Sequence, residues 1–159
     1  MISVDLARRL SAAGLRWHPA AGDRFVIEQG DFDTAEVFTV SDMTVEAHEY
    51  PTGTVLGFNG TTEWALDSVG VDETLWLPRE DQLRDLLGRS FVSLTRVAGT
   101  DGDADGSLGG TTESVVFEVR TRAPGADVEA STQTHAASLP DDAYALALLA
   151  YIESSLRLD

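Results

Sequence analysis

The chain has 159 residues, 43% of them hydrophobic, and a formal net charge of −16. All 11 basic residues are arginine, and a field of this sign repels phosphate backbones and anionic lipid, so we expect neither nucleic-acid nor membrane binding. Cysteine is absent, which excludes disulfides and thiolate metal sites, and the first residues lack the pattern of a secretory signal, so we expect a cytoplasmic protein.

The first third of the chain predicts a helix followed by short strands. Apolar spacing indicates a helix over residues 3–13, with Ser3 as its N-cap and Gly14 after its last turn. Two β-prone runs follow at residues 24–28 and 36–40. Strand formation is favoured here because β-branched and aromatic side chains dominate these runs.

A hairpin is expected next. Apolar and polar residues alternate from Met43 to His48, and Tyr50-Pro51-Thr52-Gly53 is typical of a tight turn that leads into a partner strand at residues 54–58. Residues 60–69 then predict a short helix that ends at Gly70. A second short helix is expected from Pro78, at its first position, to Leu87, with Leu83, Leu86 and Leu87 on its inner face.

The last part of the chain predicts strands and a buried helix. Residues 91–97 and 114–122 indicate two strands, and residues 128–136 indicate a less apolar third. The final helix should begin after Ser138 and be buried on more than one side, because residues 143–152 are apolar almost all round. We therefore expect an α+β fold with a mostly antiparallel sheet, an N-terminal helix, two short middle helices and a buried C-terminal helix, in a single acidic domain over residues 1–159.

A Gly/Asp-rich loop carries the sharpest motif of the sequence. Alternating carboxylates followed by glycine resemble the start of a calcium-binding loop, in which they converge on one ion. The twelfth position of that pattern is Thr112 instead of the bidentate acid, and the flanking segments predict strands instead of helices. The alternative is a solvated hairpin loop, since Gly and Asp are ordinary turn residues. The candidate ligands of a weak calcium site are Asp101, Asp103, Asp105 and Ser107.

Four other residues are candidates for binding. His48 lies among acidic residues on the polar side of its strand and could act as a base or a metal ligand, or be an ordinary exposed histidine. Asn59 and Glu63 belong to a strand-to-helix junction that could present backbone N–H groups to an anion, or form a plain turn. Trp64 is a protein-binding anchor if exposed, and a packing residue otherwise. No set of residues has the pattern of a catalytic motif.

Several segments resemble a family of short proteins from high-GC actinobacteria. These are residues 40–46, residues 57–69 with Asn59-Gly60-Thr61-Thr62-Glu63-Trp64, and residues 75–83 with Leu75-Trp76-Leu77-Pro78; the chain's opening and closing segments are similar too. Some members carry a pilus-assembly label. That label implies kinship with ParA/MinD-type ATPases, whose phosphate-binding loop contains a lysine, a residue type that this chain lacks. The resemblance brings no catalytic residues to this sequence.

Three functions are therefore compatible with the sequence. The first is a non-enzymatic interaction or accessory module whose acidity suits a basic protein partner, with a homodimer as one of the open oligomeric states. The second is a small-molecule-binding protein or enzyme with a pocket between sheet and helices. The third is a weak calcium-binding module. We expect the first, without a cofactor.

Overall fold

The structure is a computed structural model, and it describes residues 1–28, 36–41, 45–58, 68–100, 113–122 and 132–156. The chain forms two compact units. Residues Ser3–Arg79 make up the N-terminal unit, and Glu80–Asp159 together with Met1–Ile2 make up the C-terminal unit. The expected single domain over residues 1–159 stays a prediction.

The N-terminal unit begins with helix α1 (Val4–Ala12), as the sequence predicts. Leu6, Ala7 and Leu10 are buried on one face of this helix. Ser3 is the N-cap residue, but its side chain does not make the expected capping hydrogen bond. After the last turn, Gly14 adopts a φ of +101°, a conformation that side chains with a Cβ rarely adopt, so this position suits glycine.

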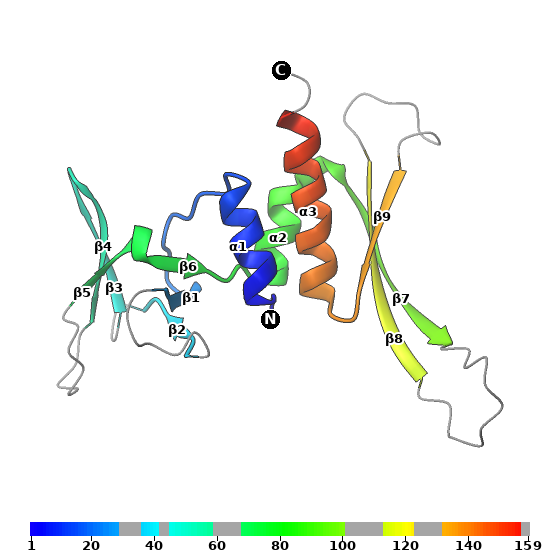
Figure 1. The fold of residues 1–159 in the computed structure, drawn as a ribbon, viewed down its shortest axis with the longest axis horizontal. Helices are drawn as coiled ribbons and strands as arrows, with labels where there is room; N and C mark the ends of the chain where they lie inside the picture. Colours follow the sequence, from blue (N-terminus) through cyan, green and yellow to red (C-terminus); the bar gives the residue numbers. More distant parts are fainter. Residues whose placement is uncertain (29–35, 42–44, 59–67, 101–112, 123–131, 157–159) are drawn as a thin grey trace. The chain divides into compact units, whose positions relative to one another are not determined.

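Two small antiparallel sheets follow in this unit (Figure 1). The first has the strand order β2-β1-β6 and the second β3-β4-β5. The bounds are β1 Arg24–Ile27, β2 Phe38–Thr39, β3 Val45–Tyr50, β4 Gly53–Phe58, β5 Ser68–Gly70 and β6 Thr74–Trp76. A 3₁₀ turn, η1 (Val71–Glu73), joins β5 to β6.

The expected hairpin is confirmed, because β3 and β4 pair in antiparallel register from Val45↔Phe58 to Tyr50↔Gly53. The expected helix over residues 60–69 is wrong at its end. Ser68–Gly70 forms strand β5, in which Val69 pairs with Leu56 of β4. Residues 59–67, the rest of that prediction, lie outside the described residues.

A single core cluster joins the two sheets. Buried side chains from both sheets and from the segment that follows β2 pack together, and partly buried aromatic and aliphatic residues pack against them. Rings continue this packing, with Phe25 contacting Trp17 and Phe38 at centroid distances of 5.5 Å each. The buried members are Phe25, Ile27, Val40, Val45, Leu56 and Val69.

The C-terminal unit is a three-stranded antiparallel meander with helix α3 packed against it and helix α2 packed against α3 (Figure 1). Its elements are α2 (Glu80–Leu87), the 3₁₀ turn η2 (Gly88–Ser90), β7 (Phe91–Thr100), β8 (Glu113–Arg122), β9 (Thr132–Ala137) and α3 (Pro140–Leu156). The expected strands are therefore confirmed, and β7 and β8 are longer than the prediction. Helix α3 packs against α2, β8 and β9.

The buried C-terminal helix is also confirmed. Six of its residues are buried, and they include neighbours in sequence, so more than one side of α3 is covered. They are Ala143, Tyr144, Ala145, Ala147, Leu148 and Leu149. In α2, Leu83 and Leu87 are buried as predicted, but Leu86 is 41% exposed, so its placement on the inner face was wrong. The helix also begins at Glu80, two residues after the expected Pro78.

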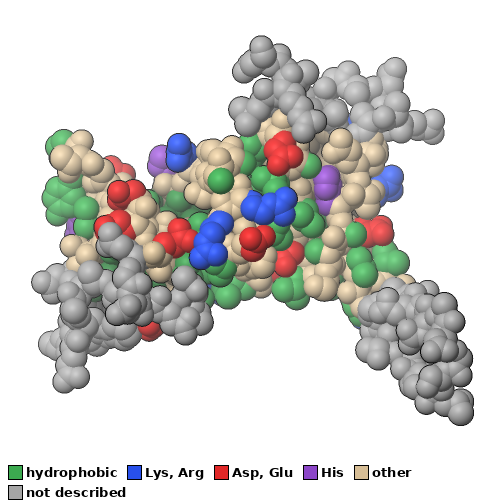
Figure 2. Space-filling model, viewed as in Figure 1, with side chains coloured by type: hydrophobic (Ala, Val, Ile, Leu, Met, Phe, Trp, Pro, Cys, Tyr) green, Lys and Arg blue, Asp and Glu red, His purple; other side chains and the backbone are tan. Residues whose placement is uncertain are grey.

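Within the described parts of each unit, acidic and arginine side chains are intermixed on the surface, as the space-filling view shows for one face (Figure 2). Eleven of the 27 acidic residues, but only one of the 11 arginines, fall outside the described residues. Most of the excess negative charge therefore belongs to segments that the structure does not describe. No described helix is long and apolar enough to cross a membrane.

Candidate functional site

A pocket of about 350 Å³ lies within the N-terminal unit. Helix α1, the segment that follows it, η1 and β6 together form its wall. Because β6 is an edge strand of its sheet, the side away from β1 faces no other strand of the described chain, and α1 lies against β6. The pocket is thus built where a helix covers the edge of a small sheet.

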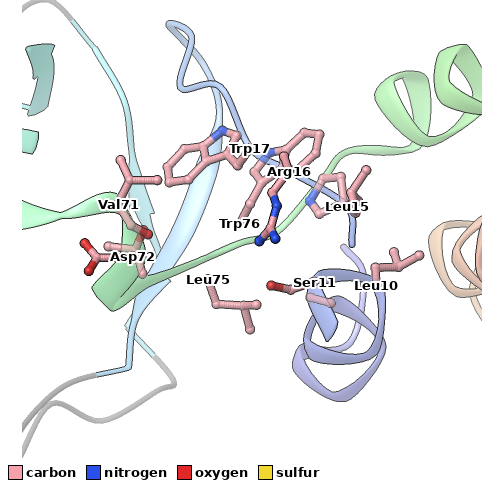
Figure 3. Close-up of a pocket in the computed structure, with 12 residues that line it drawn as sticks. Leu10, Ser11, Leu15, Arg16, Trp17, Val71, Asp72, Leu75 and Trp76 are labelled. Carbon is pink, nitrogen blue, oxygen red and sulfur yellow. The ribbon is translucent and has the colours of Figure 1, made fainter. Parts of the chain in front are cut away.

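Two tryptophans form the aromatic wall of this pocket (Figure 3). Trp17 and Trp76 lie nearly parallel, with an interplanar angle of 6° and ring centroids 6.4 Å apart. Aliphatic side chains complete the apolar lining, and a parallel pair of indoles beside them offers a surface on which a flat ring can stack. The aliphatic residues are Ala7, Leu10, Leu15, Val71, Leu75 and Pro78.

A buried carboxylate fixes one of the two tryptophans. Asp23, only 2% exposed, accepts a 2.9 Å hydrogen bond from the indole Nε1 of Trp17 and a 3.0 Å hydrogen bond from the backbone N–H of Ala20. Arg79 lies 3.3 Å from the second oxygen of Asp23 and donates to the carbonyl of Gly22 at 2.8 Å. A buried charge needs such partners, so this network both compensates Asp23 and orients Trp17.

The other tryptophan of the pocket, Trp76, has no hydrogen-bond partner for its indole N–H among the described residues, although its Nε1 is buried. An indole N–H buried away from water usually finds an acceptor, and one without an acceptor costs about 1–3 kcal/mol. Trp76 is therefore held in place by packing and by the pairing of its strand with β1 at Phe25.

Four polar side chains line the pocket, and one of them, Thr74, donates its hydroxyl hydrogen to the Val71 carbonyl at 2.8 Å. In Figure 3 the guanidinium of Arg16 lies between Trp76, Leu75 and Ser11, and the Ser11 hydroxyl points toward it, while the Asp72 carboxylate points away. Asp72 lies over Gly70, where an added Cβ would collide with the carboxylate. Arginine and serine thus offer hydrogen-bond donors to the pocket, and the one acid of the lining points away from them.

His48 lies elsewhere in the N-terminal unit. It is on β3, with Nε2 3.9 Å from the Glu46 carboxylate, and both side chains are about half exposed. Its ring lies over Gly57, so an added Cβ there would approach the ring at 3.2 Å. Within the described chain, no three His, Asp or Glu residues are grouped as a metal site requires, so His48 and Glu46 have no third ligand of this kind.

The remaining predicted site residues fall outside the described parts of the chain. Asn59, Glu63 and Trp64 belong to residues 59–67, and Asp101, Asp103, Asp105 and Ser107 belong to residues 101–112. The anion-binding junction, the protein-binding tryptophan and the calcium loop therefore stay predictions.

Two titratable groups of the C-terminal unit have shifted pKa values. Burial lowers the pKa of His135, whose Nε2 is buried without a hydrogen-bond partner among the described residues. Burial raises the pKa of Tyr144, Glu80 raises it further and Arg84 opposes the rise. The Tyr144 ring also contacts Phe91 at a centroid distance of 5.5 Å. Neither group lies at the pocket.

Sequence reasoning missed this pocket. None of the candidate residues named from the sequence is among the residues that line it. The signal that could have found this lining is the apolar and aromatic content of residues 71–78 beside that of residues 15–17, two segments that only the fold brings together.

Comparisons with protein-family models, with curated proteins and with solved structures find no match to this chain. The resemblance to the actinobacterial family therefore stays a prediction.

Proposed function

We propose that the N-terminal unit is a small-molecule-binding module whose site is the pocket between α1 and β6. The observation that carries this proposal is the pairing of two parallel indoles with a lining of aliphatic side chains in one cavity. Ligand sites are concave and mostly apolar, with a few placed polar groups, and their volumes run from about 300 to 1,000 Å³. At about 350 Å³, this pocket suits a compact ligand with a flat ring.

The site supports binding more than catalysis. Arg16 and Ser11 are donors, and no base is positioned next to the Ser11 hydroxyl among the residues that line the pocket, since Asp72 points away. A serine without a neighbouring base is a poor nucleophile. Binding of a metabolite that alters the unit's stability or its contacts is the activity that this geometry supports.

A pair of variants on one helix tests the proposal. Ser11 lines the pocket, whereas its exposed neighbour Ala12 does not. Ser11→Phe should fill the cavity and abolish the melting shift that indole induces in the wild type, and Ala12→Phe should preserve it. The change in melting temperature with indole concentration is the measurement. A wild type that shows no shift with any flat aromatic probe would overturn the proposal.

An acidic interaction module is a second candidate. The observation that favours it is the net charge of −16, to which Asp101, Asp103 and Asp105 contribute within a few residues of one another. A basic protein partner would be drawn to this charge, and salt would weaken the attraction. Capture of a partner at low and high salt, repeated with the triple variant Asp101→Asn, Asp103→Asn, Asp105→Asn, tests this. A partner retained equally by the variant and at high salt contradicts an electrostatic mode of binding.

A further inference from the structure

The polar end of the pocket has a definite charge. Its one basic group is the Arg16 guanidinium, and among the described residues neither the ion pairs nor the hydrogen bonds of the structure include this side chain. Two other arginines of the same unit are paired, Arg8 with Glu28 at 2.7 Å and Arg79 with Asp23 at 3.3 Å. Arg16 thus keeps its donors available at the pocket.

The one carboxylate of the pocket lining, that of Asp72, points away from the polar end formed by Arg16 and Ser11. Asp72 belongs to η1, where its side chain folds over Gly70 and points away from Arg16. Glu73, the next residue, accepts a 3.1 Å hydrogen bond from the backbone N–H of Gly70. The two acids of η1 are therefore turned toward the backbone of their own segment, which leaves the guanidinium as the charge that a ligand would meet.

The Ser11 hydroxyl adds a second donor beside the guanidinium. It belongs to the last turns of α1 and points toward Arg16 in Figure 3. A planar guanidinium binds a carboxylate through two parallel hydrogen bonds, and a hydroxyl beside it can donate a third. The two indoles lie next to these donors, so a ring that stacks on the indoles can place an acidic substituent against Arg16.

We infer that the pocket selects a flat aromatic acid, with the ring against Trp17 and Trp76 and the carboxylate on Arg16 and Ser11. This inference rests on the proposed small-molecule function and adds the charge of the ligand to it. The selection is notable in a chain of net charge −16, because the overall field disfavours anions and the local guanidinium must overcome it. Raising the salt concentration therefore screens both the repulsion of an anion by the whole chain and its attraction to Arg16.

Three probes that share one ring test the charge preference. Indole is neutral, indole-3-acetate is an anion and tryptamine is a cation, so differences in affinity report the substituent alone. Calorimetric titration of the intact chain should give the tightest binding for indole-3-acetate and the weakest for tryptamine. Arg16→Gln should weaken indole-3-acetate about tenfold or more and leave indole unchanged, because hydrogen bonds to charged groups are the stronger ones.

Two controls keep the outcomes separate. Arg24→Gln removes an exposed arginine that does not line the pocket, and it should leave all three affinities unchanged. Arg16→Lys keeps the charge without the planar fork, and it should restore part of the loss. Equal binding of the three probes, unaffected by Arg16→Gln, would overturn the inferred selectivity and leave the small-molecule function standing. Absence of binding by every probe would overturn both.

Discussion

The two units of this chain pack their side chains differently. The N-terminal unit divides its strands between two small sheets, joined by a core that depends on aromatic rings and on one buried carboxylate. The C-terminal unit has one meander of longer strands and a helix that is buried on several sides. The comparison teaches that the less regular unit is the one that contains the aromatic pocket. Short strands leave edges that a helix and indole rings cover, and such coverage leaves room for a ligand.

The largest effect should come from the aromatic core of the N-terminal unit. Phe25 is fully buried and contacts two other rings, so Phe25→Ala should lower the free energy of unfolding of this unit by about 3–5 kcal/mol. Urea titration followed by tryptophan fluorescence measures it, since all three tryptophans lie in this part of the chain. Tyr50→Ala, at an exposed position of β3 in the same unit, should change the unfolding free energy by less than about 0.5 kcal/mol.

The buried carboxylate should matter nearly as much. Asp23→Asn weakens the contacts with Arg79 and Trp17, and we expect a loss of about 2 kcal/mol, as for hydrogen bonds to charged groups. The fluorescence of Trp17 should shift to longer wavelength as its ring loosens. Asp72→Asn, at an exposed position of the same unit, is the matched control. If Asp23→Asn is as stable as the wild type, the contacts of Asp23 with Trp17 and Arg79 do not stabilise the unit.

Trp76 should respond in the opposite direction. Trp76→Phe keeps a ring in the wall and removes the buried N–H that has no partner, so stability should stay equal or rise by up to about 1 kcal/mol. Differential scanning calorimetry without ligand gives the sign. Trp17→Phe is the contrast, because the indole N–H of Trp17 has an acceptor and its loss should destabilise the unit. A marked loss in Trp76→Phe would contradict this expectation, because lost packing of the larger indole would then outweigh the removal of the N–H.

The smallest effect concerns pH in the C-terminal unit. Burial lowers the pKa of His135, so below its ordinary value of 6.5 the unfolded chain binds more protons than the folded one. Stability is therefore complete above pH 6.5 and declines as the pH falls toward the lowered pKa. His135→Val should flatten this decline, measured as urea midpoints between pH 7.5 and 5. Gln133→Val on the same strand should retain the slope of the wild type.

Local patterns predicted the elements whose signals lie within one segment. The hairpin of β3 and β4 follows from alternation around Pro51 and Gly53, and α3 follows from the apolar run of residues 143–152 together with the start signal after Ser138. The helix predicted up to Val69 is wrong at its end, because the pattern of only three residues, Ser68–Gly70, is too short to distinguish a helix from a strand. Pairing with β4 decides that Val69 is in a strand.

The pocket could not be predicted for a related reason. It requires Trp76 to lie opposite Phe25 in β1, with Trp17 stacked beside it, and nothing within any one of these segments specifies that pairing. The residues singled out in the sequence, such as Trp64 and Asp101, lie in polar or glycine-rich segments outside the described residues. Glycine and polar residues surround these candidates, as is typical of functional loops. The pocket, in contrast, is lined mainly by side chains that resemble ordinary core residues.

The strand order has a consequence for the time course of folding. In the C-terminal unit each strand pairs with the next one along the chain, so its ladder needs only short loop closures. In the N-terminal unit, β1 pairs with β6, and the segment that contains β3, β4 and β5 separates these two strands along the chain. Their pairing therefore needs a long loop closure. Non-local pairings are slower to form. In pulse-labelled refolding, the amide of Val119 should gain protection before that of Val26. During synthesis, the unit that leaves the ribosome first must then wait for Trp76 before its pocket can exist.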